Sequence, residues 1–290
     1  MFITSESLGT YLFRFRNPIR VIKRILDHEY PFEVRLRSGA KYTIFGHSQI
    51  YILGKTGEYL TYNEVDGYLI VDYNNLNLSF YDSLENGAIY EVFRAEEYKA
   101  LDVIGRVVID VGANIGDTAI YFALNGADRV VSAEPHIRSF QSALKNIRVN
   151  GLESKVIPLN VALGSNETIL KINQRQDVDG GSSLHLTKDG DEIHAMSLKH
   201  MVEEFKVSDG ILKMDCEGCE YDCLMSSDAD TLRSFHQILL EYHFGPKKIS
   251  KKLESVGFQV SRLKKGYIGW NTRSTPHVMR TGTLLATLIA

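Results

Sequence analysis

The chain has 290 residues, enough for one large domain or two smaller ones with a sizeable buried core. Its 33 Lys and Arg residues against 36 Asp and Glu residues give a net charge of −3, which argues against a general nucleic-acid-binding protein. The longest apolar tail, 284–290, is far shorter than the ~20 residues of a membrane-spanning helix. The amino terminus also lacks the apolar core of a signal peptide, so we expect a cytoplasmic protein.

The first predicted element is a helix that runs from Pro18 to about Asp27. Apolar residues recur there at every third or fourth position, and Asn17 before Pro18 is typical of a helix start. We expect this helix to pack on its own domain or on a second subunit. In the second case the protein would be a homo-oligomer. Because basic residues lie between the apolar ones, contact of 18–27 with a membrane surface is a weaker alternative.

Short alternating runs of apolar and polar residues follow, separated by Gly and Asn, and they predict a small β-rich section. The predicted seam to the rest of the chain is Glu85-Asn86-Gly87. We therefore divide the chain into residues 1–89, a helix with a β-rich section, and residues 90–290, a second domain.

From Ile104 onward strands alternate with helical stretches, which predicts an α/β fold with a parallel sheet covered on both faces. The tail is expected to pair two strands as an antiparallel terminal hairpin. Together the strands predict a doubly wound, mostly parallel, seven-stranded sheet. The predicted strands are 107–110, 129–133, 156–160, 210–215, 237–243, 258–263 and 282–290.

A glycine turn follows the first of these strands. The strand ends in Asp110, the turn holds Gly112, Asn114 and Gly116, and the second strand ends just before Glu134. Main-chain N–H groups at the start of a helix favour an anionic group, and an acid in this place accepts hydrogen bonds from ribose hydroxyls. The stretch therefore predicts a nucleoside-bearing cofactor. The NAD fingerprint GxGxxG is not met, because Asn114 stands where its second glycine belongs.

Other predicted strands also end in polar residues, and ligands of open α/β sheets bind at such ends. Asp215 with Glu217 follows the fourth strand, and Glu241 with His243 closes the fifth. The third strand ends at Asn160, which is polar but uncharged.

Five strings occur in this order: VVIDVGANIGDTAIYFA, VVSAEP, LNVALG, LKMDCEGCEYDCL and ILLEYH. With them the chain resembles the FkbM family of S-adenosylmethionine-dependent O-methyltransferases from about Tyr90 to Ala290. The resemblance implies a Rossmann-like methyltransferase fold, S-adenosylmethionine as cofactor, and a sugar or other small polyhydroxylated molecule as the methyl acceptor. From the net charge we expect no nucleic acid as partner. Two alternatives stay open: an NAD-dependent oxidoreductase, and a non-catalytic scaffold protein that binds the cofactor.

The resemblance also assigns roles to single residues. For catalysis it implies only that Asp215 faces the methyl group. Because a sugar hydroxyl needs a base to remove its proton, we expect His243 as the first candidate base, Asp215 as the second, and Glu217 as the residue that orients either one. The residues it implies for cofactor binding are Asp110, Gly112, Asn114, Gly116, Glu134, Asn160, Ala162 and Asp215.

Three cysteines, Cys216, Cys219 and Cys223, lie within eight residues of each other. We expect buried thiols, because three ligands at this spacing do not match a zinc or iron–sulfur motif. No metal site is assigned, although a divalent cation held by Asp215, Glu217 and Glu241 is an alternative way to activate the acceptor. The acceptor is expected to be selected by loop 173–186 and by the β-rich section.

Overall fold

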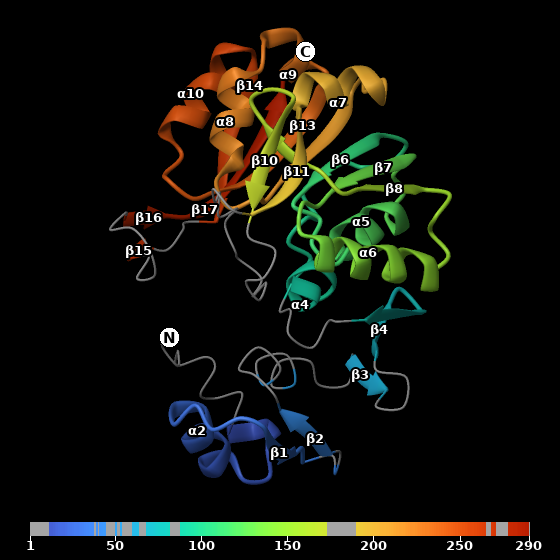
Figure 1. The fold of residues 1–290 in the computed structure, drawn as a ribbon, viewed down its shortest axis with the longest axis vertical. Coiled ribbons are helices and arrows are strands. Elements are labelled where there is room, and N and C mark those ends of the chain that lie inside the picture. The colour runs from blue at the N-terminus through green and yellow to red at the C-terminus, as the bar shows by residue number, and fades with distance from the viewer. Residues whose placement is uncertain are drawn as a thin grey trace. The chain divides into compact units, whose positions relative to one another are not determined.

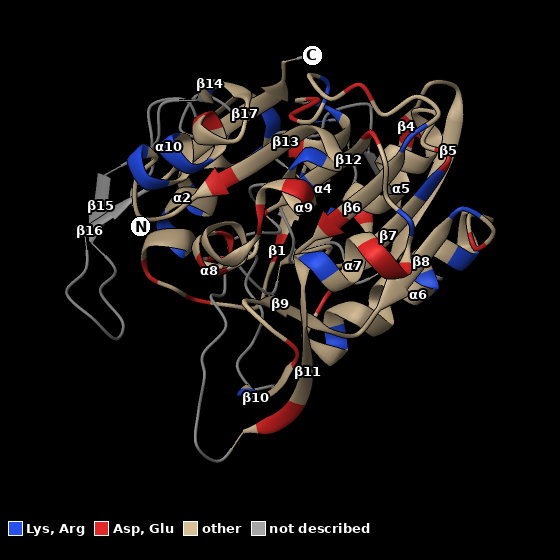
Figure 2. Cartoon of the chain, turned by 90° about the horizontal axis from the view of Figure 1, so that it is seen from above, with Lys and Arg blue, Asp and Glu red and all other residues tan. Residues whose placement is uncertain are grey.

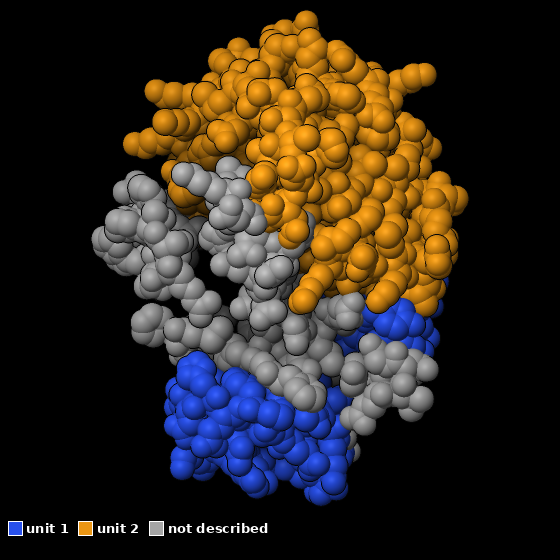
Figure 3. Space-filling model, in the orientation of Figure 1, with its two compact units in different colours: residues 1–97 blue, residues 98–290 orange. Residues whose placement is uncertain are grey.

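The computed structural model forms two compact units, residues 1–97 and residues 98–290 (Figure 3). The units divide after Glu97, so the boundary predicted after residue 89 falls inside helix α4 (Ala88–Phe93) of the first unit. The residues that the structure describes are 12–37, 39, 41–44, 50, 53, 60–63, 68–81, 88–172, 190–264, 268–270 and 278–289.

The first unit contains the predicted amino-terminal helix, α2 (Pro18–Leu26). Val21 and Ile25 on this helix are buried against Phe15 and against an antiparallel strand pair, while Ile19 stays 80% exposed. The helix is amphipathic as its spacing predicts. The strand pair is β1 (Phe32–Arg35) and β2 (Lys41–Ile44).

A three-stranded antiparallel sheet completes the first unit, so the predicted β-rich section is confirmed. On its middle strand, Leu69 and Val71 are buried in alternation with more exposed neighbours, which is the pattern of a sheet with one face covered. Phe93 of α4 packs edge-on against Tyr73, with ring centres 5.2 Å apart. The strands are β3 (Leu60–Asn63), β4 (Tyr68–Tyr73) and β5 (Leu76–Tyr81).

The second unit is built on a seven-stranded sheet in the order β14-β17-β13-β12-β6-β7-β8 (Figure 1). Five neighbouring strands run parallel, and β17 pairs antiparallel with both β13 and β14. The predicted mostly parallel sheet with an antiparallel end is therefore confirmed. Its strands are β6 (Val107–Val111), β7 (Arg129–Ala133), β8 (Val156–Leu159), β12 (Gly210–Met214), β13 (Phe235–Tyr242), β14 (Phe258–Lys264) and β17 (Gly282–Leu288).

Helices cover both faces of this sheet. Alternate strand residues, such as Ile109 and Leu212, pack in one apolar cluster with Leu224, Leu232 and Leu253 from the helices on that face. Figure 1 shows α5 and α6 together below β7 and β8. The helices are α5 (Asp117–Leu124), α6 (Ile137–Val149), α7 (Leu198–Glu204), α8 (Cys219–Ser226), α9 (Ala229–Arg233) and α10 (Lys247–Ser255).

The chain leaves the main sheet between β8 and α7 and forms a second sheet in the order β10-β11-β9. Its strands are β9 (Ala162–Gly164), β10 (Thr168–Ile172) and β11 (Asp191–Ser197), and a further pair is β15 (Ile268–Trp270) with β16 (Val278–Arg280). The predicted acceptor loop 173–186 lies outside the described residues. Among the helices described, none is long and apolar enough to cross a membrane.

Candidate active site

The turn after β6 lies directly against the end of β12. Gly112 adopts a left-handed φ of 76°, and its N–H donates a hydrogen bond to the carbonyl of Ala133 at 3.0 Å. A Cβ atom on Gly112 would lie 1.9 Å from the main-chain oxygen of Asp215, a distance that no side chain tolerates. Glycine at this position therefore allows the turn of residues 112–116, called the cofactor turn below, to contact the strand end that carries Asp215.

The same turn continues into α5 through two more left-handed residues. Gly116 has a φ of 83°, and a Cβ there would lie 3.1 Å from the Cβ of Ala143, so glycine permits close packing of α5 on α6. Asn114 has a φ of 48°, and its N–H donates to the Oε2 of Glu134 at 2.9 Å. Asparagine adopts this conformation more readily than most residues. The turn and the acid at the end of β7 are thus directly bonded.

Glu134 is only 7% exposed and is fixed by main-chain donors. Its second oxygen accepts the N–H of His136 at 2.8 Å, and burial raises the pKa of its carboxyl to about 7. Each oxygen keeps lone-pair capacity for a ligand hydroxyl. Asn160 donates from Nδ2 to the carbonyl of Glu134 at 2.8 Å, so it shapes this strand end, whereas Ala162 is buried in a small apolar cluster of the second sheet.

Asp110 is fully buried on the other side of the turn, and the groups that contact its carboxylate are side chains of this same chain. Its Oδ2 accepts the Thr118 hydroxyl at 2.5 Å, and its Oδ1 lies 3.0 Å from the Nζ of Lys213. Lys213 is the neighbour of Asp110 in the strand register, is 1% exposed, and also donates to the carbonyl of Gly112 at 2.9 Å. The ion pair of Asp110 and Lys213 therefore holds the turn in place from within the core.

Lys213 is a site residue that the sequence analysis missed. Burial lowers its pKa, but the negative charges of Asp110 and Asp215 outweigh this effect, so the pKa is raised and the ammonium stays charged. Asp117 at the start of α5 is buried nearby, and burial raises its pKa to about 7. The signal in the sequence is a single lysine inside an otherwise apolar strand, GILKM.

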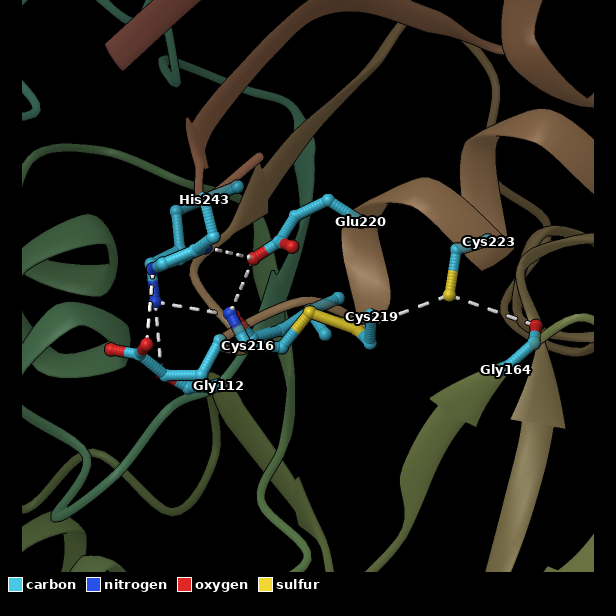
Figure 4. Close-up of a disulfide and its surroundings, with 10 residues drawn as sticks. Gly112, Gly164, Cys216, Cys219, Glu220, Cys223 and His243 are labelled. Carbon is cyan, nitrogen blue, oxygen red and sulfur yellow. Dashed lines mark hydrogen bonds and ion pairs between the residues drawn. A yellow bond between two sulfur atoms is a disulfide. The ribbon is translucent and has the colours of Figure 1, made fainter. Parts of the chain in front are cut away.

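A second cluster joins the ends of β12 and β13 (Figure 4). The Nε2 of His243 lies 3.1 Å from the Oε2 of Glu217, and its Nδ1 lies 3.4 Å from the Oε1 of Glu220. Burial lowers the pKa of His243, but the two carboxylates outweigh it and raise the pKa to about 11, so the ring is an imidazolium at neutral pH. Glu220, which the sequence analysis also missed, is fully buried and accepts the N–H of Cys216 at 3.0 Å.

Asp215 completes this cluster. Ligand atoms of Asp215, Glu217 and His243 lie within 4.8 Å of one another. Burial raises the pKa of Asp215 to about 6, although the positive charge of Lys213 lowers it. Among the described residues this group could hold a metal ion, and it contains His243 instead of the predicted Glu241. In Figure 2 acidic residues mark the ends of β6 and β13, as the strand-end pattern predicts.

The cysteines correct one prediction. Cys216 and Cys219 form a disulfide, so the expectation of free thiols is wrong for these two, while Cys223 is a buried thiol as expected. The physical reason is the turn between them: Glu217 and Gly218 have φ values of 57° and 127°, which brings the two cysteine Cα atoms to 5.5 Å. Burial raises the pKa of Cys223 to about 12.

The order of the sheet, the glycine turn after β6 and the acid at the end of β7 define a Rossmann-like methyltransferase. The model of the Methyltransferase FkbM domain matches residues 110–265, more than half of the chain, and the chain belongs to this family. The predicted family is therefore confirmed, and with it a methyltransferase domain that uses S-adenosylmethionine as its cofactor. This membership favours methyl transfer over the nicotinamide alternative.

Solved structures similar to this chain share little sequence with it. The FkbM methyltransferase from Methylobacillus flagellatus KT is 14% identical with a TM-score of 0.42, over 63% of this chain and 43% of that one, so this chain spans less than half of that protein. A candidate tRNA methyltransferase from Streptococcus pneumoniae is 15% identical, with a TM-score of 0.41 over 68% and 71% of the two chains. TrmK from M. capricolum, solved with S-adenosylhomocysteine, is 10% identical, with a TM-score of 0.43 over 68% and 67%. No curated protein matches the chain.

Proposed function

We propose that this protein transfers a methyl group from S-adenosylmethionine to a hydroxyl of a sugar or another small polyhydroxylated molecule. The observation that carries this proposal is the position of Asp215. Its carboxyl has a pKa of about 6, lies with Glu217 and His243 in one cluster, and follows the strand end that the Gly112 turn contacts. A carboxylate that titrates near neutral pH beside the cofactor turn is suited to take a proton from a hydroxyl.

The residues around the turn fit the cofactor. The main-chain N–H groups of the turn and the start of α5 would hold its amino acid end, and Glu134 would accept its ribose hydroxyls. When bound, the cofactor supplies a methyl group on a positively charged sulfur. Three carboxyls near the turn, the buried Asp117 and Glu134 and the half-buried Asp215, have raised pKa values because desolvation disfavours their charge. A cationic ligand stabilises their ionised forms.

The contacts of His243 favour Asp215 as the base. An imidazolium between two carboxylates has no lone pair free to accept a proton, whereas Asp215 is ionised above about pH 6. In the proposed mechanism Asp215 accepts the hydroxyl proton as the acceptor oxygen attacks in line. Glu217 orients His243, which keeps a positive charge beside the ionised Asp215.

Incubation with radiolabelled S-adenosylmethionine tests the proposal. Two acceptor pools are compared, one of mono- and oligosaccharides and one of tRNA, and mass spectrometry identifies the labelled product. We expect label in the sugar pool and release of S-adenosylhomocysteine. An Asp215→Asn variant should bind the cofactor more weakly, because one of the three carboxylates is lost, and at saturating cofactor it should lose roughly 100- to 10,000-fold in turnover.

Label in tRNA and none in sugars would refute the proposed acceptor. Cofactor binding without label in any pool and without S-adenosylhomocysteine would instead support the scaffold alternative. Full turnover by the Asp215→Asn variant would refute the role of Asp215.

A further inference from the structure

A pocket of about 230 Å³ lies between the second sheet and the loop that joins β12 to α8. Leu163, Leu170 and Ala195 line it from the sheet, and the disulfide of Cys216 and Cys219 lines it from the loop. The bordering residues Gly164, Cys216 and Cys219 are labelled in Figure 4. Because drug-sized ligands occupy about 300–1,000 Å³, this pocket suits a molecule of roughly one ring.

Glu217 connects the pocket to the cluster of Asp215 and His243. It lines the pocket, and its Oε2 lies 3.1 Å from the Nε2 of His243. The disulfide brackets Glu217 on both sides in the chain, so it limits the conformations of this residue. A ring in the pocket would therefore lie against Glu217, one of the three residues of the cluster that contains the proposed base.

The charge of the lining selects among ligands. The described residues of the lining include two carboxylates, Glu217 and Asp222, and three neutral polar side chains, Ser165, Asn166 and Thr168, but no Lys, Arg or His. Glu217 is paired with His243, which leaves Asp222 as the acid that meets a ligand among these described lining residues. An anionic group would be repelled there, whereas hydroxyl or ammonium donors find acceptors.

We infer that this pocket binds the methyl acceptor as a single sugar-sized ring that is neutral or carries an amino group, and that Asp222 selects against phosphorylated or carboxylated rings. This assignment rests on the proposed function, because it deepens the identity of the acceptor. It places acceptor selection on β9, β10 and the β12–α8 loop.

A steric pair of variants tests the location. Thr168 and Leu170 line the pocket, while Ile169 between them on β10 is 54% exposed and does not, because strand neighbours point to opposite faces. Thr168→Trp fills the pocket, and Ile169→Trp places the same side chain on the other face as the matched control. Binding of glucosamine, glucose and glucuronic acid is followed by saturation-transfer NMR on the full chain with S-adenosylhomocysteine present.

The expected result is binding of glucosamine and glucose that Thr168→Trp weakens more than about tenfold and Ile169→Trp leaves unchanged. Cofactor affinity, measured by calorimetric titration, should stay within about twofold in both variants. Sugar binding that survives Thr168→Trp, or absence of sugar binding in the unmodified protein, would overturn the assignment.

A charge pair of variants tests the selectivity. Asp222→Asn should remove a preference for glucosamine over glucose of up to about fivefold, the effect of one exposed carboxylate. Asp128→Asn, an exposed acid outside the pocket lining, is the control and should keep the preference. A stronger affinity for glucuronic acid than for glucose would overturn the charge argument. These binding readouts need no methyl transfer, so their failure is distinct from a failure of the proposed reaction.

Discussion

Replacing Lys213 with Met is the sharpest test of how the cofactor turn is held. The substitution keeps an apolar stem of similar length but removes the ammonium that lies 3.0 Å from Asp110 and 2.9 Å from the carbonyl of Gly112. Asp110 would remain fully buried, with the Thr118 hydroxyl still bonded to it but without its counter-charge. Breaking a buried ion pair from one side costs about 3–5 kcal/mol.

We therefore expect Lys213→Met to lower the free energy of unfolding by about 3–5 kcal/mol, measured by urea denaturation followed by circular dichroism. A Lys whose pKa is raised on folding contributes its full stabilisation below its unfolded pKa of about 10.4 and loses it only as the pH rises through the higher folded pKa. The full effect is therefore expected at pH 7. Cofactor affinity should also fall, because Lys213 holds the Gly112 carbonyl.

The double variant Asp110→Asn with Lys213→Met serves as the control. It removes both charges of the pair, so its loss of stability should be smaller than the sum of the losses of the two single variants. A loss below about 1 kcal/mol for Lys213→Met, or strict additivity of the two changes, would show that the pair does not support the turn.

Three further predictions concern the turn, the acid of β7 and the disulfide. Gly112→Ala should abolish cofactor binding in a calorimetric titration, because its Cβ would lie 1.9 Å from a main-chain oxygen, whereas Gly151→Ala, with nothing within 4 Å, should bind normally despite a strain of about 1 kcal/mol. Cofactor affinity should fall about eightfold from pH 7.5 to pH 6 as Glu134 protonates near pH 7. Glu134→Gln should flatten this pH dependence, and equal slopes of affinity against pH in the two proteins would contradict the role of Glu134. Reduction of the Cys216–Cys219 disulfide should lower stability by roughly 2 kcal/mol in thermal unfolding, and a variant with both cysteines changed to Ser should not respond to the reductant.

The sequence predicts the sheet of the second unit well because its strands are buried on both faces. Such strands require nearly continuous apolar residues, and β6 and β7 show this directly. The polar residues that end these strands are equally visible, so the sequence indicates Glu134 and Asp215 as acids at strand ends. Left-handed turns favour glycine and asparagine, so Gly112 and Asn114 mark the turn before any coordinates are known.

Pairings across the fold are not visible in the same way. Lys213 and Glu220 are buried by partners that lie far away in the chain, Asp110 for the first and His243 for the second. In the sequence Glu220 resembles an ordinary polar residue of a helix surface. Lys213 stands out as the single charge in an apolar strand, but the strand alone does not identify its partner. The disulfide depends on the turn geometry at Glu217, and the protonated state of His243 depends on carboxylates from another element. These properties follow from tertiary contacts.

The position of β17 has a consequence for folding during synthesis. This strand lies between β13 and β14, and its Leu284 and Ala286 are fully buried, yet it follows both partners in the chain. Until residues 282–288 leave the ribosome, β13 has an unpaired edge and β14 has no partner in the main sheet. An apolar edge of this kind promotes aggregation, so the nascent chain depends on rapid insertion of β17 or on chaperones at this stage.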